Sequence, residues 1–293
     1  MAASTNISPL ELSIVIPSFN DEEILLLCLE SIYQDKKISN YRIIVIDNGS
    51  KLPLSAKIKN KFPGVIWLRN KKNTGFASAI NQGIINNPAQ FYTVLNSDTI
   101  LEKDCLSRLI EFLKNNPEAA ACGPMIRSPQ GIIQPSCRRF PSFFIILASR
   151  RSVLSRFFPL NRFSRRYLLS NWDHLNLRRV NWIAGTCMVI RAKAWDKIGQ
   201  FSEDYFMYCE DADWCLRAKE KGWKIYYLPN VSLVHSLRGN NPGLKLILEH
   251  HKSMLIFLLR LGLKNFLKLL KNTFKESLGQ SKIKTCAKNR AQK

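Results

Sequence analysis

The chain has 293 residues, of which 46% are hydrophobic, and a formal net charge of +22 at pH 7. This length and apolar content suffice for one large hydrophobic core or two modest ones. The eight cysteines include no C-x-x-C pair, which argues against a disulfide scaffold and favours a cytoplasmic protein with reduced thiols. We expect no signal peptide, because no basic residue precedes the first apolar run, and no membrane-spanning helix, because apolar runs such as 143–148 and 254–259 stop after six residues.

The positive charge is concentrated in two segments of the chain. Residues 138–179 contain ten basic side chains and one acidic side chain, and residues 244–293 contain twelve basic and two acidic ones. The remaining segments, 1–137 and 180–243, have net charges of only +2 and +1. We therefore expect a polyanion or an anionic membrane surface to bind the two basic segments.

In chain order, the first part of the sequence alternates short apolar runs with segments of helical pattern. The apolar runs predict strands at 12–17, 42–46, 65–68, 91–95 and 119–122. The segments between them predict helices at 22–34, where Asn20-Asp21 can form the N-cap, and at 56–61, 76–85 and 105–114. This alternation indicates a mostly parallel sheet with helices on both faces.

Small or polar residues follow each of the first four predicted strands. They are Ser18-Phe19-Asn20, Asp47-Asn48, the segment 70–75, and Asn96-Ser97-Asp98. Ligands of parallel sheets bind beyond the carboxyl ends of the strands, so these residues predict a crevice for a nucleotide. The chain has neither a G-x-G-x-x-G sequence after its first strand nor a G-x-x-x-x-G-K-[ST] sequence, which argues against a dinucleotide cofactor and against a P-loop.

The next part of the chain begins with a turn or hairpin at 127–137. The basic segment 138–179 that follows interleaves its arginines with aromatic residues. Residues 180–190 predict a strand that is interrupted by small residues, and 192–198 predict a helix. Two further strands are predicted at 224–228 and 231–235, and the second ends at His235, which by itself is more often a packed residue than a catalytic one.

An acidic helix precedes those two strands. Glu210, Asp211 and Asp213 occupy its predicted first turn, where the helix dipole favours negative charge, and Gly222 can end the helix in a left-handed conformation. Asp213 and Arg217 are four residues apart and can form an ion pair along one helix face. One interpretation is that the acids only cap and solvate a surface helix. The other is that Glu210 and Asp211 serve a site.

The C-terminal region predicts an amphipathic helix over 255–278. Apolar residues recur there at helical spacing beside a sector of arginine and lysine, a pattern typical of helices at a membrane interface. The same apolar stripe could instead pack on the body of the protein. We expect residues 1–243 to form one domain with 138–179 as a basic, aromatic-rich insertion, and 244–293 to form a basic amphipathic helical extension.

Several of these segments, between about residues 12 and 240, together resemble the family-two glycosyltransferases. The matching segments are 14–20, 45–50, 73–77, 95–98, Gly185-Thr186, 208–217 and Val234-His235. Within that family the chain is most similar to bacterial rhamnosyltransferases that build polysaccharides on lipid carriers. The resemblance implies the α/β fold called GT-A, with a Rossmann-like central sheet between helices. It also implies an inverting, metal-dependent transfer of a sugar, such as rhamnose from its dTDP donor, in the synthesis of cell-envelope glycans.

The resemblance assigns a role to each residue at the predicted crevice. A magnesium or manganese ion would bind Asp98 and His235, while Asn96 and Ser97 stand where the family pattern has a further aspartate. Other residues would bind the donor nucleotide: Pro17, Phe19, Asp47, Asn73, Gly75, Asn96 and Ser97. Asp211 would be the catalytic base that deprotonates the acceptor hydroxyl. Trp182 and Glu210 would shape the acceptor side.

Two other functions stay open at this point. One is transfer of a sugar directly to polyprenyl phosphate. The other, from a different class, is nucleic-acid binding by the basic and aromatic segments, although these lie outside the neutral core. For the glycosyltransferase we expect a lipid-linked glycan acceptor, no nucleic acid partner, and a cytoplasmic location at the inner face of the cell membrane.

Overall fold

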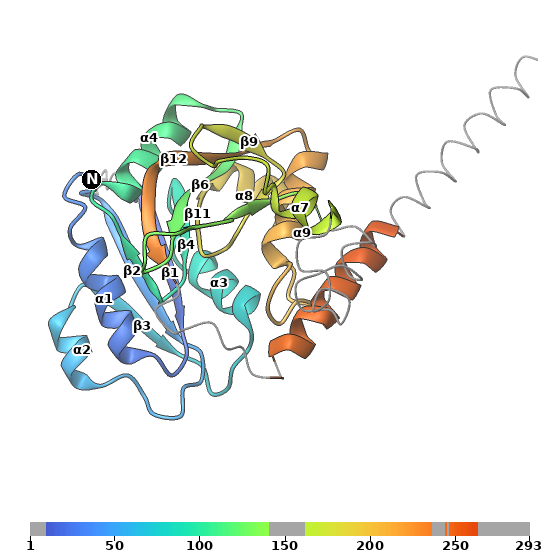
Figure 1. The fold of residues 1–293 in the computed structure, drawn as a ribbon. Coiled ribbons are helices and arrows are strands. Elements are labelled where there is room, and N and C mark those ends of the chain that lie inside the picture. Colours follow the sequence, from blue (N-terminus) through green and yellow to red (C-terminus); the bar gives the residue numbers. More distant parts are fainter. Residues whose placement is uncertain (1–9, 141–161, 236–243, 245, 263–293) are drawn as a thin grey trace, which may run out of the picture.

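The computed structural model describes residues 10–140, 162–235, 244 and 246–262 (Figure 1). Its strands are β1 (Leu12–Ser18), β2 (Tyr41–Asp47), β3 (Val65–Arg69), β4 (Phe91–Leu95), β5 (Thr99–Leu101), β6 (Ala119–Arg127), β7 (Ile133–Gln134), β8 (Cys137–Arg138), β9 (Arg178–Val180), β10 (Trp182–Ile183), β11 (Cys187–Arg191) and β12 (Lys224–His235). Its helices include α1 (Glu22–Ile32), α2 (Ala56–Lys61), α3 (Phe76–Ile85), α4 (Cys105–Asn115), α7 (Arg162–Leu168), α8 (Ala192–Ile198) and α9 (Glu210–Glu220). A further helix covers 246–262.

The central sheet has the strand order β3-β2-β1-β4-β11-β6-β12-β5. The first four strands in this order are parallel, as predicted, and β12 is parallel to β6. β11 is antiparallel to both of its neighbours, β4 and β6. The chain enters β11 at the edge where β4 ends, because Cys187 pairs with Leu95 and the backbone N–H of Asn96 donates to the Thr186 carbonyl (2.9 Å). This reversal brings Gly185 and Thr186 to the edge that carries the polar strand ends.

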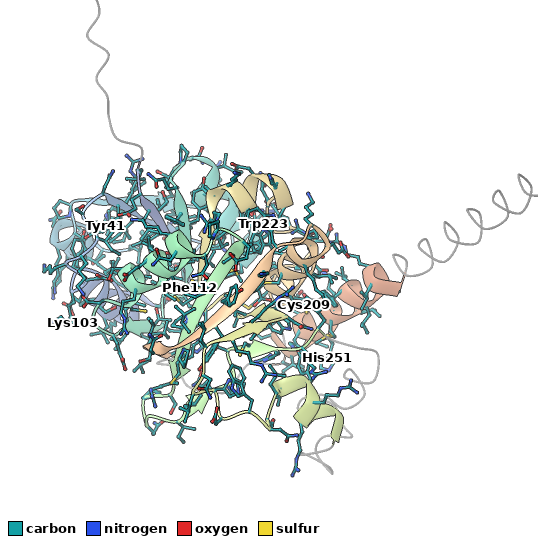
Figure 2. The ribbon with its side chains drawn as sticks, turned by 90° about the horizontal axis from the view of Figure 1, so that it is seen from above. Tyr41, Lys103, Phe112, Cys209, Trp223 and His251 are labelled. Atoms are coloured by element: carbon teal, nitrogen blue, oxygen red, sulfur yellow. The ribbon has the colours of Figure 1, made fainter. Side chains whose placement is uncertain are left out.

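Helices cover the sheet on both faces and produce two hydrophobic cores. Alternate residues of β1 point into different cores. Ile14 and Ile16 lie in the core with α1 and α4, whereas Val15 lies in the core with α3. Figure 2 shows the described side chains and labels Phe112 of α4. The Phe112 ring meets Tyr226 of β12 with ring centroids 5.2 Å apart. The predicted α/β architecture of a mostly parallel sheet between helices is confirmed.

One strand, β12, replaces the two strands predicted at 224–228 and 231–235. The register with β6 shifts between Leu228 and Ser232, so a β-bulge accommodates Pro229, which has no N–H to donate to the sheet. Beyond the bulge, His235 lies opposite Thr99 of the short strand β5. The proline suggested a break in the sequence, whereas the chain continues as one strand and delivers His235 next to the end of β4.

The C-terminal helix at 246–262 packs against the loop that precedes α9. Met254 and Phe257 are buried in the core, and the Ser253 hydroxyl donates to the Met207 carbonyl (2.7 Å). Leu259, the first residue of the apolar stripe predicted within 255–278, is exposed, as is Leu255. The rest of that stripe lies outside the described residues. Within the described part of the chain, no helix is both long and apolar enough to cross a membrane.

Candidate active site

The polar strand ends lie together at one edge of the sheet, as the sequence predicted. In the parallel register, Ser18 lies opposite Asp47, and Asp47 lies opposite Arg69 at the end of β3. The ends of β1, β2, β3 and β4 are therefore adjacent. They form one side of the candidate site, and the segment from Gly185 to the start of α9 forms the other.

Asp47 is buried at the end of β2 and is held by the turn that follows. Its Oδ1 accepts a hydrogen bond from the backbone N–H of Ser50 (2.9 Å), and Arg69 Nε lies 3.6 Å from Oδ2. Among the described residues, Asp47 Oδ2 has no hydrogen-bond partner, although it is buried. A buried carboxylate oxygen without a partner is costly unless a ligand satisfies it. The role of Asp47 in binding the donor stays a prediction.

Asn48 organises the loop that follows β3, a role that the sequence analysis did not predict. Its Oδ1 accepts from the backbone N–H and the hydroxyl of Thr74 (3.1 and 3.0 Å) and from Asn70 Nδ2 (3.0 Å). Its Nδ2 donates to the Gly75 carbonyl (3.0 Å) and to Asn73 Oδ1 (3.1 Å). Asn73 Oδ1 also accepts from the Gly75 N–H (3.0 Å). Asn73 and Gly75, both predicted to bind the donor, are thus shaped by a neighbour of Asp47.

Gly75 is required at its position by both conformation and space. Its φ is +90°, and a Cβ there would lie 2.5 Å from the Phe206 carbonyl oxygen. The next residue, Phe76, donates its backbone N–H to the same oxygen (2.8 Å). The Phe76 ring approaches Gly185, where a Cβ would lie 3.2 Å from Cε1. Phe76 therefore joins the donor loop to the segments of the opposite side of the site.

Asp21 does not cap α1 with its side chain, which corrects the sequence prediction. It occupies the N-cap position without a capping hydrogen bond. Instead its Oδ1 accepts from the Ser18 hydroxyl (2.5 Å) and the Phe19 N–H (2.9 Å), and its Oδ2 accepts from the Ser97 hydroxyl. Through these hydrogen bonds Asp21 joins the end of β1 to the end of β4. Ser97, which follows β4, is thereby linked to Asp21 at the start of α1. Phe19 is 38% exposed and lies near the half-buried Pro17 in the sequence.

Asp98 and His235 come together although 137 residues separate them in sequence. Asp98 Oδ1 lies 3.4 Å from His235 Nε2, and Asn96 Nδ2 lies 3.4 Å from the same nitrogen. His235 Nδ1 is 3.3 Å from Gln134 Oε1. Because an amide oxygen can only accept, this contact favours a proton on Nδ1, and in that tautomer the lone pair of Nε2 can bind a metal ion beside Asp98. An Asp oxygen and an imidazole nitrogen side by side fit a divalent cation.

The fit is partial, because other ligands would have to complete the coordination. Within the described residues, no group of three or more histidine, cysteine, aspartate or glutamate side chains gathers to hold a metal ion. Magnesium and manganese prefer six ligands, mostly oxygen, and are commonly held by one or two side chains together with substrate phosphates. Asp98 and His235 suit that type of site, in which the substrate supplies part of the ligand set.

Glu210 and Asp211 begin α9 after a strained turn. Tyr208 and Cys209 have φ values of +71° and +69°, a conformation that non-glycine residues rarely adopt and that often occurs at functional sites. The Gly185 N–H donates to Asp211 Oδ2 (2.9 Å), and the Ala212 N–H donates to Oδ1 (2.7 Å). Both carboxyl groups are buried, so the interpretation of solvated surface acids is wrong for this pair.

The two buried acids have different electrostatic environments. Burial, and then the negative charge of Asp211, raise the pKa of Glu210 well above its usual value. Burial also raises the pKa of Asp211, but the backbone N–H groups of Gly185 and Ala212 and the charge of Arg138 oppose this rise. Glu210 Oε2 has no hydrogen-bond partner among the described residues. The pair therefore favours one negative charge, on Asp211, with Glu210 protonated.

Trp182 and Arg138 form the wall next to Asp211. They pair in register between β10 and β8, and the Arg138 guanidinium lies 5.4 Å from the centre of the buried Trp182 ring. The Trp182 Nε1–H donates to the Arg139 carbonyl (2.8 Å). Arg138 Nε is buried and has no hydrogen-bond partner among the described residues. The sequence analysis assigned no site role to Arg138, whose only signal was its place at the start of the basic segment.

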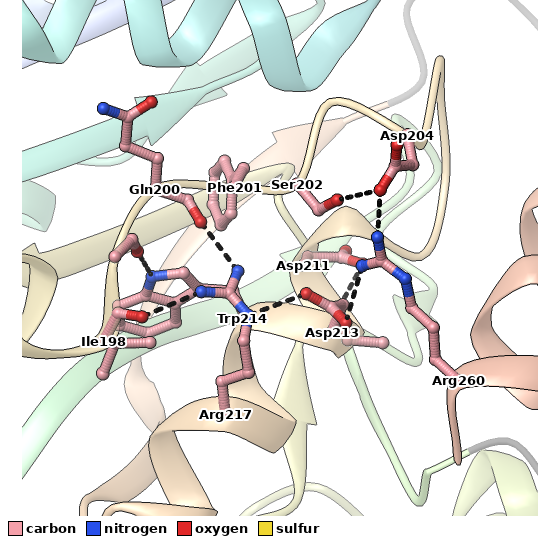
Figure 3. Close-up of polar contacts among 12 residues, drawn as sticks. Ile198, Gln200, Phe201, Ser202, Asp204, Asp211, Asp213, Trp214, Arg217 and Arg260 are labelled. Carbon is pink, nitrogen blue, oxygen red and sulfur yellow. Dashed lines mark hydrogen bonds and ion pairs between the residues drawn. The ribbon is translucent and has the colours of Figure 1, made fainter. Parts of the chain in front are cut away.

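Arg217 holds α9 in place, as the sequence predicted (Figure 3). Its Nε donates to Asp213 Oδ2 (2.8 Å), and its terminal nitrogens donate to the carbonyls of Ile198 (3.0 Å) and Gln200 (2.7 Å). The helix ends with Lys221 at the C-cap, followed by Gly222 with a φ of +82°. Arg217 thereby anchors α9 to the loop that follows α8, and the helix presents its first turn to Gly185.

Comparison with known proteins identifies relatives of the chain. The family model for glycosyl transferase family 2 matches residues 13–174. The N-acetylglucosaminyl-diphospho-decaprenol L-rhamnosyltransferase of Mycobacterium tuberculosis is 31% identical over 230 residues, which cover 74% of each chain. The rhamnosyltransferase WbbL of Escherichia coli is 26% identical over 257 residues, covering 84% of this chain and 92% of that one.

Solved structures with the same fold have much lower sequence identity. GalNAc-T7 with UDP, GalNAc and Mn²⁺ superposes with a TM-score of 0.59 at 16% identity, covering 80% of this chain and 46% of that one. The mannosyltransferase PcManGT of Pyrobaculum calidifontis, in complex with GDP-Man and Mn²⁺, gives a TM-score of 0.54 at 14% identity, covering 81% of this chain and 61% of that one. The chain thus spans less than two thirds of either solved chain. These likenesses confirm the GT-A fold.

Proposed function

The chain belongs to glycosyl transferase family 2 and is a glycosyltransferase, and on this premise we propose that it transfers a sugar, with inversion, to a lipid-linked glycan acceptor. The proposed donor is a nucleotide-diphosphate sugar, and dTDP-rhamnose is the first candidate. The candidate sugar and the acceptor class are supported by the names of the relatives from Mycobacterium tuberculosis and Escherichia coli. The observation that carries the proposal is a buried carboxylate, Asp211, that accepts from Gly185 on the side of the candidate site across from the four strand ends.

In the proposed reaction, Asp211 removes the proton of the acceptor hydroxyl. A general base should be ionised but basic, and Asp211 combines a pKa raised by burial with backbone N–H donors that stabilise its charge. The Gly185 N–H orients Asp211 Oδ2, so the carboxylate is positioned before the acceptor arrives. The oxygen of the acceptor would then attack the anomeric carbon of the donor from the face opposite to the nucleotide, and the nucleoside diphosphate would leave.

Glu210 and Trp182 would act on the acceptor side without exchanging protons. A protonated Glu210 limits the charge that is buried at the start of α9, because the two acids raise each other's cost of ionisation. Trp182 is buried and held by the Arg139 carbonyl, so it would act as a rigid aromatic support behind the acceptor side.

The donor would lie along the strand ends on the other side of the crevice. Asp47 Oδ2 is the buried acceptor that a nucleoside N–H or hydroxyl could satisfy, and Phe19 and Pro17 would flank the base. Asp98 and His235 would hold a divalent cation, which when bound neutralises negative charge on the diphosphate leaving group. Asn96 and Ser97 contribute mainly by placing these ligands, through the contacts with His235 and Asp21.

A screen of nucleotide sugars on the full-length protein tests this function. The chain is incubated with pyrimidine- and purine-linked sugars, with and without Mn²⁺ or Mg²⁺, and release of nucleoside diphosphate is measured. We expect metal-dependent turnover of a pyrimidine-linked sugar, and faster turnover when an amphiphilic glycoside acceptor is added. If no nucleotide sugar is consumed with any metal or acceptor, the proposal is wrong.

We also propose that the enzyme works at the inner surface of the cell membrane. The C-terminal fifty residues contain twelve basic and two acidic side chains, and each basic residue near anionic lipid contributes about 1 kcal/mol. Exposed Leu248, Leu255 and Leu259 lie on the described part of this region. The comparisons give no support for the alternative of nucleic-acid binding.

A further inference from the structure

A pocket of about 590 Å³ lies outside the crevice, and its wall is unusually basic. Four arginines line it: Arg139, which follows β8, Arg165 and Arg166 of α7, and Arg178 of β9. We call it the arginine pocket. Its volume lies within the range of ordinary small-molecule sites. Four exposed arginine residues around one hollow give it a positive electrostatic potential, so the arrangement favours an anionic occupant.

The backbone around the arginine pocket is held in a defined conformation. After α7 the chain turns through Leu169, whose φ is +55°, a strained value for a residue with a branched side chain. The Ser170 N–H donates to the Arg165 carbonyl (3.0 Å), and the Trp172 N–H donates to the Leu169 carbonyl (2.9 Å). Strain of this kind is retained where the surrounding structure maintains it, often at binding sites.

An aromatic cluster supports the part of the arginine pocket around Trp172. The Arg178 guanidinium lies 4.8 Å from the centre of the Trp172 ring, within the range of a cation–π contact. Trp172 in turn meets Tyr227 of β12 with ring centroids 5.1 Å apart, and the Tyr227 hydroxyl donates to the His174 carbonyl (3.0 Å). Trp172 and Leu169 give this wall an apolar part beside the charged one.

The arginine pocket is connected to the proposed catalytic base by two neighbouring residues. Arg138 lies over Trp182, and its charge acts on Asp211, whereas Arg139 lines the pocket. The Arg139 carbonyl accepts from Trp182 Nε1 (2.8 Å), and the Arg139 N–H donates to the Tyr167 carbonyl on α7 (3.0 Å). The acceptor wall and the pocket are thus parts of one continuous structure.

We propose that the arginine pocket binds the diphosphate of a lipid-linked acceptor, with the first part of the lipid chain against Trp172 and Leu169. This inference rests on the proposed function, which places the acceptor hydroxyl at Asp211. Guanidinium groups form paired, charge-assisted hydrogen bonds with phosphate oxygens, and several of them match the multiple charges of a diphosphate. A site for single-stranded nucleic acid would instead need several aromatic faces for stacking, and among the described residues that line the pocket only Trp172 is aromatic.

Binding of farnesyl diphosphate to the full-length protein tests the proposal. Titration calorimetry with a metal chelator present removes metal-dependent binding at the crevice. We expect farnesyl diphosphate to bind, and Arg165→Gln/Arg166→Gln to weaken it by about tenfold, the effect of losing a charge-assisted hydrogen bond. The matched control, Lys57→Gln/Lys59→Gln, removes two exposed charges from α2 and should leave the affinity unchanged. If the double variant does not fold, Arg178→Gln carries the same expectation.

The comparison ligands separate the possible sources of the anion. Farnesol, inorganic diphosphate and a single-stranded RNA oligonucleotide should each bind at least tenfold more weakly than farnesyl diphosphate. Equal binding of inorganic diphosphate, stronger binding of RNA, or an affinity for farnesyl diphosphate that is unaltered in the folded variants would overturn the proposal. Donor turnover by the unaltered chain decides the proposed function separately, so a failure of this binding test with turnover intact rejects the arginine pocket alone.

Discussion

Arg260 of the C-terminal helix forms an ion pair with Asp213 of α9, with 3.5 Å between Nη1 and Oδ1 (Figure 3). The other oxygen of Asp213 is bound by Arg217, and Arg260 also contacts Asp204. Asp213 therefore lies between two guanidinium groups, two positions after the proposed base. The C-terminal helix therefore supports the candidate active site, although it lies beyond Gly243, where the predicted catalytic domain ends.

Replacement of the proposed base should abolish most of the turnover. In Asp211→Asn an amide oxygen can still accept from the Gly185 N–H, so the fold should survive. We expect donor binding to remain and turnover to fall by about two to four orders of magnitude, the usual contribution of a positioned base. Steady-state kinetics and donor titration measure both. Asp196→Asn, on the exposed side of α8, is the matched control. Full turnover by folded Asp211→Asn would remove Asp211 from this role.

Replacement of Glu210 by glutamine should be tolerated, because burial and the charge of Asp211 already favour the protonated acid. A folded-state pKa above the unfolded one stabilises the protein at low pH, and this stabilisation is lost as pH rises through the folded-state value. As pH rises through the folded-state pKa of Glu210, the free energy of unfolding of the wild type should therefore decline relative to that of Glu210→Gln. Denaturant titrations at several pH values measure the difference. If the free energy of unfolding of Glu210→Gln depends on pH in the same way as that of the wild type, Glu210 is ionised in the folded protein.

Alanine substitutions at Asp98 and at His235, the two proposed metal ligands, should weaken metal binding to different degrees. Asp98→Ala should abolish the metal-dependent binding of nucleoside diphosphate, because Asn96 and Ser97 cannot supply a negative charge. His235→Ala should weaken the metal affinity by a smaller factor. Calorimetric titration of nucleoside diphosphate with and without Mn²⁺ measures both effects. If His235→Ala instead unfolds the protein while the metal affinity of the folded fraction is unaltered, His235 is a packed residue and not a ligand.

The hydrogen bonds of Asn48 should make it important for both stability and donor binding. Asn48→Ala removes the partner of Thr74, Asn70 and Gly75 in a buried setting, for which we expect a loss of about 1–3 kcal/mol in the free energy of unfolding. The donor KM should rise, because the loop of Asn73 loses its support. Asn70→Ala, a half-buried control in the same network, should cost less. Equal effects of the two variants would contradict a central role for Asn48.

The sequence predicted the part of the site that depends on sheet topology. Ser18, Asp47 and Asp98 follow apolar strands, and parallel strands bring such residues to one edge. The contacts across that edge were not predictable, because each joins segments far apart in sequence. Asp21 looked like a local cap, yet it binds Ser97, which is 76 residues away. The roles of Arg138 and Arg260 depend on packing of the same kind, which no local pattern encodes.

The last prediction concerns the membrane, and the structure determines where the chain should be cut. A truncation after Gly243 would remove Met254 and Phe257 from the core together with Arg260, so a loss of activity would be ambiguous. A truncation after Gly262 keeps this packing and removes nine basic residues and one acidic residue. Each basic residue near an anionic surface contributes about 1 kcal/mol, so this segment could dominate binding.

We expect the full chain to co-sediment with anionic liposomes at low salt, to be released at high salt because the attraction is screened, and to bind neutral liposomes poorly. The chain that ends at Gly262 should sediment much less while keeping its donor hydrolysis. A full-length variant with Lys264, Lys268, Lys271 and Lys275 changed to glutamine separates charge from length and should behave like the truncated chain. If the full chain does not co-sediment with anionic liposomes at low salt, the surface-binding hypothesis is wrong. If it binds them as well without residues 263–293, the arginines of 138–179 become the remaining candidates for the contact.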